Sequence, residues 1–188
     1  MSQKYLHRVI WITGFSGAGK TTVGHILNQK LSALGKKVLN IDGDEIRSAL
    51  DGFNSMRRFD RISRLQNAQV YTEISKVFMK QCDYVIVSTI SMFNEIYQLN
   101  KEVFPNYFEV FLDVPQKIRS ERDPKNFYKQ LDQDRISNFC GQDLDVDQPI
   151  DANFIYLYQS GHNAEFVAEL LIERLNDHFQ ERWLGNAI

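Results

Sequence analysis

The chain has 188 residues, which is the size of one domain with a substantial hydrophobic core. Its apolar content of 43% and charged content of 24% are ordinary for a soluble globular protein. The formal net charge of −2 argues against a general binder of nucleic acid or membrane surfaces, because such proteins need an excess of basic residues.

The first predicted element is a buried strand at residues 9–13, a short run of β-branched and aromatic residues. Residues 14–21 then match G-x-x-x-x-G-K-S/T, the P-loop, in which backbone N–H groups and a helix N-terminus bind phosphate. We expect Lys20 to reach the β- and γ-phosphates of ATP and the Thr21 hydroxyl to ligate Mg²⁺. The predicted ATP-binding residues of this loop are Gly14, Ser16, Gly17, Ala18, Gly19, Lys20, Thr21 and Thr22.

Apolar residues at helical spacing follow the loop and end at Gly35, and residues 38–41 form the second predicted strand. We expect a short helix at residues 45–50, interrupted by Gly52, and a long helix over about 58–80. The apolar inner face predicted for the long helix consists of Ile62, Leu65, Val70, Ile74, Val77 and Phe78. Further strands are predicted at 83–88, 108–112 and 153–157, and further helices at 94–102, 115–121 and about 166–179.

Strands and helices alternate, which predicts an α/β fold: a P-loop NTPase-type parallel sheet sandwiched by helices. No repeat or linker divides residues 1–188, so we expect a single kinase domain. The periodicity fails over about 122–151, and a connection of this length in a compact domain is typical of a functional lid.

The two cysteines stand far apart, at Cys82 and Cys140, without neighbours at metal-ligand spacing. The first eight residues lack the apolar centre of a signal peptide, and no apolar run approaches 18 residues. We therefore expect a cytoplasmic protein with reduced thiols that contacts neither a membrane nor nucleic acid.

Two absences narrow the class of P-loop protein. A guanine-reading Asn-Lys-x-Asp sequence is missing, the nearest string being Asn100-Lys101-Glu102-Val103. The third strand runs into Ser88-Thr89 instead of the acidic pair of a motor-type ATPase. These features favour a small-molecule kinase, and the alternative from another class is an ATP-binding regulatory protein without an acceptor.

Asp42 and Asp44 follow the second strand and are the predicted catalytic carboxylates. One would accept the proton of the acceptor hydroxyl, and the other, Asp44 in our assignment, would hold Mg²⁺ through water. The structural alternative is that Asp44 caps the short helix that follows.

Five arginines lie between residues 47 and 64, against only two aspartates. Arg57, Arg61 and Arg64 would share one face of a helix, which favours a site for an anionic acceptor over a solvated surface. Phe53, just ahead of them, would stack on a base or fill the core. The arginines of this run are Arg47, Arg57, Arg58, Arg61 and Arg64.

These residues resemble the adenylylsulfate kinase (APS kinase) family. The resemblance extends from the first strand to about Pro149, and its most specific part is the lid sequence Arg-Asp-Pro-Lys-x-x-Tyr-Lys at 122–129. The other matching segments are the P-loop at 14–22, Asp-Gly-Asp-Glu-Ile-Arg at 42–47, the Ile-Ser turn at 90–91 and Phe-x-Gly-x-Asp at 139–143.

The resemblance implies ATP-dependent phosphorylation of the 3′-hydroxyl of adenylylsulfate. It implies that Phe53 and Phe139 sandwich the acceptor base and that Lys125 brings positive charge to the transferring phosphoryl group. It also places Arg122 at the ATP side of the lid, and it implies that family members are often homodimers. The residues implied at the acceptor's ribose and acidic groups are Arg47, Arg58, Ile90 and Ser91; the family serine, here Ser91, has also been described as a phosphoserine intermediate.

Departures from the family pattern concern the acceptor, and they are Glu45, Arg61, Met92, Asn126-Phe127 and Val146. Replacing the family's Asn by Arg61 adds a charge and removes a hydrogen-bond acceptor, which points to an altered acceptor pocket. A related alternative keeps the reaction and changes the nucleotide, as in the cytidine diphosphoramidate kinases, which are similar to this family.

Overall fold

The computed structural model describes residues 7–54, 60–122 and 145–180, and for residues 51–54 it describes the helix but not the side chains. The predicted site residues Arg58, Lys125 and Phe139, the side chain of Phe53 and most of the predicted lid therefore lie outside the described part.

Within the residues that the structure describes, five parallel strands form one sheet in the order β2-β3-β1-β4-β5. Because the strands are parallel, their carboxyl ends meet at one edge, and the register aligns Asp42 with Ser88 and Ser88 with Ile12. The predicted parallel α/β sheet is confirmed. The strands are β1 (Arg8–Thr13), β2 (Val38–Asp42), β3 (Tyr84–Ser88), β4 (Tyr107–Asp113) and β5 (Phe154–Leu157).

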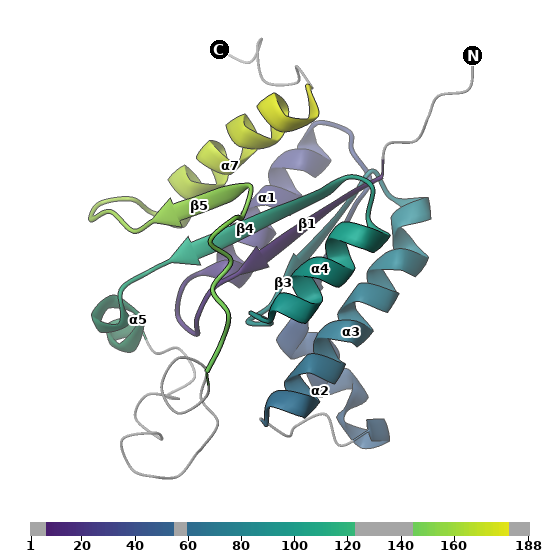
Figure 1. The fold of residues 1–188 in the computed structure, drawn as a ribbon. Coiled ribbons are helices and arrows are strands. Elements are labelled where there is room, and N and C mark those ends of the chain that lie inside the picture. Colours follow the sequence, from purple (N-terminus) through teal and green to yellow (C-terminus); the bar gives the residue numbers. More distant parts are fainter. Residues whose placement is uncertain (1–6, 55–59, 123–144, 181–188) are drawn as a thin grey trace, which may run out of the picture.

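Helices cover both faces of the sheet (Figure 1). α1 (Lys20–Ala33) and α7 (Ala164–Phe179) pack on one face, and α3 (Arg61–Phe78) and α4 (Asn94–Val103) on the other. The remaining elements are α2 (Gly43–Asn54), the 3₁₀ turn η1 (Met79–Gln81) and α5 (Gln116–Arg122). Within the described ranges, no helix combines the length and apolar character needed to cross a bilayer.

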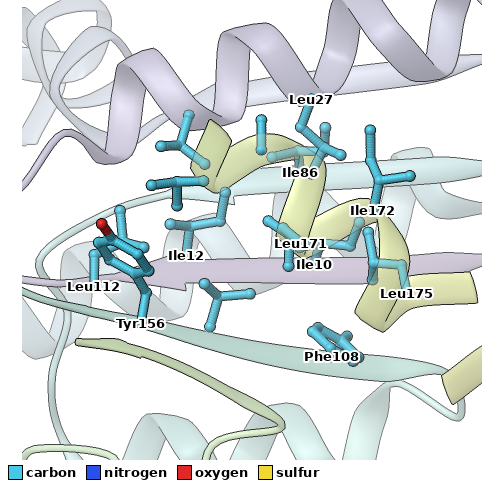
Figure 2. Close-up of a cluster of buried hydrophobic side chains, with 14 of the residues drawn as sticks. Ile10, Ile12, Leu27, Ile86, Phe108, Leu112, Tyr156, Leu171, Ile172 and Leu175 are labelled. Carbon is cyan, nitrogen blue, oxygen red and sulfur yellow. The ribbon is translucent and has the colours of Figure 1, made fainter. Parts of the chain in front are cut away.

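The larger core lies between the sheet and the α1–α7 layer. Ile10 and Ile12 of β1 meet Leu27 of α1 and Leu171 of α7, and all four are fully buried (Figure 2). Burying each such side chain contributes about 1.5–3 kcal/mol, so this layer fixes β1 and with it the start of the P-loop.

Two predicted helices differ from the structure. α2 begins at Gly43 and continues through Gly52 to Asn54, so the predicted interruption at Gly52 is wrong. In α3 the predicted inner residues Ile62 and Val77 are 70% and 61% exposed, and Phe78 is 42% exposed. The buried face of α3 instead consists of Asn67, Ala68, Tyr71, Thr72 and Ser75.

The buried face of α3 is polar because its polar atoms have partners inside the fold. Thr72 Oγ1 donates to Asn100 Oδ1 at 2.8 Å, and Ser75 Oγ donates to Tyr71 O at 2.8 Å. A hydroxyl that keeps a hydrogen bond can be buried at little cost, whereas a hydropathy scale counts every buried hydroxyl as unfavourable. Apolar periodicity therefore missed this polar buried face, although two of the predicted inner residues, Leu65 and Ile74, do pack against the core.

The same polar chain ends at a buried carboxyl on β4. Asn100 Nδ2 donates to the Tyr107 hydroxyl at 3.4 Å, and that hydroxyl donates to Glu109 Oε1 at 3.5 Å. Glu109 is only 1% exposed, and burial raises its pKa to about 7, although Lys101 and Tyr107 oppose the shift. Glu109 is therefore protonated in the folded chain at pH values where an exposed glutamate is charged.

We predict that Glu109 lowers the stability of the fold as the pH rises. A carboxyl whose folded pKa exceeds its unfolded pKa binds more protons in the folded state, so stability falls between about pH 4.5 and 7. The loss across this window is on the order of 3 kcal/mol, and Glu109→Gln should remove it. Denaturant unfolding at a series of pH values measures this slope. Glu102→Gln, at an exposed position of α4, is the control, and an unchanged slope in Glu109→Gln contradicts the assignment.

Candidate active site

A cavity of about 420 Å³ opens at the carboxyl edge of the sheet. The P-loop, residues 16–22, lines one wall. The opposite wall comes from the end of β2, the first turn of α2, the first three turns of α3, and residues 88–91 at the end of β3 and just after it. A third group, from the β5–α7 connection and the end of α5, consists of Tyr158, His162, Asn163 and Arg122.

The P-loop has the backbone geometry that its glycines allow. Gly17 has φ 78°, and a Cβ there would lie 2.8 Å from the carbonyl oxygen of Arg119. Gly19, at φ 95°, is the N-cap of α1, and no side chain caps this helix. The first-turn N–H groups of α1 therefore lie where the loop lines the cavity, which is the arrangement that binds phosphate oxygens. Lys20 Nζ donates to Phe15 O at 2.9 Å, across the same loop.

Asp42 connects the P-loop helix to the opposite wall. Its Oδ2 accepts a hydrogen bond of 2.6 Å from Thr21 Oγ1, and its Oδ1 accepts one of 2.8 Å from the backbone N–H of Asp44. The second bond makes Asp42 the capping side chain of α2. The alternative that Asp44 caps this helix is wrong, because α2 begins at Gly43, earlier than predicted.

Asp44 is left in the first turn of α2, where its Oδ1 pairs with Arg47 Nη2 one turn later. Its side chain is 39% exposed and lines the cavity, whereas Asp42 is 8% exposed. The two aspartates therefore differ in position: Asp42 is buried and bonded within the fold, and Asp44 faces the cavity.

The oxygen atoms around Thr21 fit a magnesium ion. Thr21 donates its proton to Asp42, so the lone pairs of its hydroxyl oxygen remain available to a metal. Mg²⁺ takes hard oxygen ligands, usually one or two from the protein and the rest from water and phosphate. In the part of the chain that the structure describes, no three His, Cys, Asp or Glu side chains gather into a metal site.

The wall opposite the P-loop carries positive charge and hydrogen-bond donors. Arg47 of α2 and Arg64 of α3 both line the cavity, and so do Asn67 and Tyr71 further along α3. The Tyr71 hydroxyl donates to Gly43 O at 2.8 Å, and burial raises its pKa to about 12, so it stays a donor at neutral pH. Two guanidinium groups in one cavity favour an anionic ligand on this side.

Ile90 and Ser91 line the same cavity after β3. The Ser91 and Thr89 hydroxyls lie 2.8 Å apart, and Ser91 is 8% exposed. A serine nucleophile is activated by a neighbouring base, and a threonine hydroxyl does not act as one. The contact therefore supports a binding role for Ser91 more than a covalent one.

The remaining described site predictions divide into two groups. Arg122 lines the cavity, donates from Nη1 to Gly17 O at 3.2 Å, and lies 5.6 Å from the centre of the Tyr158 ring. Arg61 is not among the described residues that line the cavity; its guanidinium pairs with Glu95 of α4.

Sequence reasoning did not single out several lining residues. Asn67 and Tyr71 lie three and seven residues after Arg64, which the sequence already indicated as part of an anionic acceptor site, so a polar stripe of helical period on α3 was the available signal for these two. Tyr158, His162 and Asn163 follow the last strand, and only the parallel topology, which brings that strand's end to the same edge, could have located them.

Comparison with known proteins agrees with this geometry. The model of the adenylylsulphate kinase family matches residues 7–156. The chain belongs to this family. It is therefore a kinase, a phosphotransferase with an alcohol group as acceptor, and the family binds ATP and acts on small-molecule nucleotides.

Individual relatives differ in the nucleotide that their names state. An adenylyl-sulfate kinase of Aeromonas hydrophila is 35% identical over 165 residues, covering 87% of this chain and 82% of that protein. A cytidine diphosphoramidate kinase of Campylobacter jejuni is 35% identical over 167 residues, covering 89% of this chain and 95% of that protein. The structure of a Mycobacterium tuberculosis APS kinase in complex with AMPPNP and APS is 25% identical, with a TM-score of 0.79 over 90% of this chain and 97% of that one.

We predict that Gly17→Ala disrupts ATP binding while Gly35→Ala does not. Both glycines have positive φ, 78° and 76°, so both variants carry a strain of about 1 kcal/mol. Only at Gly17 does the new methyl group meet backbone, the Arg119 carbonyl, whereas nothing lies within 4 Å at Gly35. We expect at least about a tenfold weaker ATP affinity in Gly17→Ala by calorimetry, a factor equal to about 1.4 kcal/mol. Equal ATP affinity in the two variants would contradict this account of the loop.

Proposed function

We propose that the protein transfers the γ-phosphoryl group of ATP to the 3′-hydroxyl of a nucleotide, with adenylylsulfate as the leading acceptor. The observation that carries the proposal is that the P-loop and the side chains of Asp44, Arg47 and Arg64 line the same cavity. A phosphoryl donor and an anionic acceptor can be held there with their reacting groups in line.

On the donor side, the P-loop N–H groups and Lys20 bind the phosphates, and Arg122 closes over the loop at Gly17. Mg²⁺, bound by Thr21 and through water by Asp44, would neutralise charge on the β- and γ-phosphates. Asp42 orients the Thr21 hydroxyl and fixes the start of α2. Asp42 would thus influence the binding of ATP and Mg²⁺ only indirectly, by orienting Thr21.

On the acceptor side, we assign the proton of the attacking hydroxyl to Asp44 as well, in place of Asp42, because Asp44 lines the cavity and Asp42 uses both its oxygens within the fold. Arg47 pairs with Asp44, and with Arg64 it supplies charge for the acceptor's phosphate and sulfate groups. The proposed contacts of Phe53, Arg58, Lys125 and Phe139 with the acceptor and the transferring group follow from the family resemblance, as does a homodimeric assembly.

A second acceptor is favoured by one specific observation. The Campylobacter jejuni relative named a cytidine diphosphoramidate kinase is matched over 95% of its length. The same cavity would then serve a cytidine nucleotide with the same transfer chemistry.

ADP release measured with each acceptor tests the proposal. Adenylylsulfate should stimulate release if it is the acceptor, and a cytidine diphosphate derivative should do so in its place if the second candidate is correct. Sugar phosphates are the negative controls and should not stimulate ADP release. Release that no nucleotide stimulates would reject the kinase proposal for all acceptors tested and favour a regulatory ATP-binding protein.

We predict that Asp44→Asn lowers kcat by about a hundredfold or more, because positioned acid–base groups contribute about 10²–10⁴-fold. Lys20→Ala should remove acceptor-dependent turnover by weakening the contact with the phosphates. Asp177→Asn, at an exposed position of α7, changes the same charge away from the cavity and is the control. Initial rates of ADP release at saturating acceptor measure these effects. Full activity in Asp44→Asn would exclude Asp44 as the base.

A further inference from the structure

Arg61, Glu95 and Asp147 form a charged contact, here called the Arg61 clamp, where three segments meet. Arg61 is the first residue of α3, Glu95 lies in the first turn of α4, and Asp147 lies in the segment that leads to β5. Arg61 Nη2 is 2.9 Å and 3.2 Å from the two carboxylate oxygens of Glu95, and 3.9 Å from Asp147 Oδ2. The guanidinium also lies 5.1 Å from the centre of the Phe93 ring.

Asp147 is itself fixed to the start of α4 by three hydrogen bonds. Its backbone N–H donates to Met92 O at 3.0 Å, and its Oδ2 accepts from the backbone N–H of Asn94 at 3.1 Å. Its carbonyl oxygen accepts from the Tyr97 hydroxyl at 2.8 Å. Arg61 therefore joins α3 to a unit of α4 and residue 147 that is already held together.

The position of Arg61 is unfavourable for its own helix. A cation at a helix N-terminus opposes the helix dipole, and α3 is already capped by Asp60, whose side chain accepts from Ser63 N at 3.0 Å. Glu95, in contrast, lies at the favourable end of α4, where its own backbone N–H and then Arg61 lower its pKa. The gain from Arg61 must therefore come from the contact between the helices.

The Arg61 clamp is next to Arg64 and Phe93, two residues that line the acceptor half of the cavity. Arg64 is one helical turn after Arg61 on α3, and Phe93, which is 1% exposed to solvent, stands two residues before Glu95. Ile90 and Ser91, on the same wall, precede Phe93 in the chain. A change in the distance between the first turns of α3 and α4 would change the distance between Arg64 and Phe93.

We propose that Arg61, held by Glu95 and Asp147, is a positioning residue for the acceptor: it sets the spacing between Arg64 and Phe93 without binding the acceptor itself. This rests on the proposed function, because the acceptor half of the cavity is defined there. It also gives a role to Arg61, which stands where the family has Asn: the positive charge that this replacement adds is balanced by the carboxylates of Glu95 and Asp147.

The variants Arg61→Ala and Glu95→Ala distinguish positioning from direct binding by the sign of their effects. If Arg61 positions the wall, both variants raise the acceptor KM, about three- to fivefold for a half-exposed ion pair, and the double variant adds little. If Arg61 attracts the anionic acceptor directly, Glu95→Ala frees its charge and lowers the acceptor KM. The KM for ATP should stay unchanged under the proposal.

Lys76→Ala is the matched control, because it breaks an exposed ion pair with Glu73 on the same helix, at 2.8 Å. Hydrogen exchange at the Asn94 amide, measured without nucleotides, gives a second readout, and Arg61→Ala should accelerate it several-fold. A lower acceptor KM in Glu95→Ala, or unchanged KM and exchange in both variants, overturns the proposal. If the wild type shows no acceptor-dependent turnover, the proposed function fails, and the exchange measurement still decides whether the clamp holds the two helices together.

Discussion

The hydrogen bond from Thr21 to Asp42 is the contact on which the site depends. It joins the first turn of the P-loop helix to the end of β2, and Asp42 simultaneously caps α2. The sheet makes this bond possible, because the register places Asp42 level with Ser88, and Ser88 level with Ile12 of β1. The buried carboxylate of Asp42 thereby orients the Thr21 hydroxyl and also fixes the start of α2, the helix that carries Asp44 and Arg47.

Close packing keeps the two sides of this bond together. A Cβ at Gly24 of α1 would lie 2.5 Å from Ser88 Oγ, so a side chain there would force Ser88 or α1 to shift. Ser88 Oγ donates to Lys20 O at 3.3 Å, and the Tyr71 hydroxyl holds Gly43 from the side of α3. The P-loop, β2, β3 and α3 are therefore one connected frame, and the cavity is the space that the frame leaves at the sheet edge.

The sequence predicted the structure best at motifs whose residue spacing is determined by the chemistry they perform. The P-loop and the alternation of strands and helices predicted the fold, and the aspartates after β2 were expected at the edge where the structure places them. The inner face of α3 could not be read from hydropathy, because partners such as Asn100, which satisfy its polar side chains, are remote in sequence. The same limit applied to Asp42, whose role as a cap depends on where α2 begins, and to Arg61, whose partners Glu95 and Asp147 become neighbours only after folding.

We propose that the protein transfers phosphate from ATP to a nucleotide 3′-hydroxyl in this cavity. The most direct test is to follow the terminal phosphate of γ-labelled ATP into the nucleotide product and to map its position with a 3′-specific nucleotidase. The account predicts that the label is in the acceptor nucleotide and that this nucleotidase releases all of it. Label found only in inorganic phosphate, or at a position that the 3′-specific nucleotidase leaves intact, would contradict it.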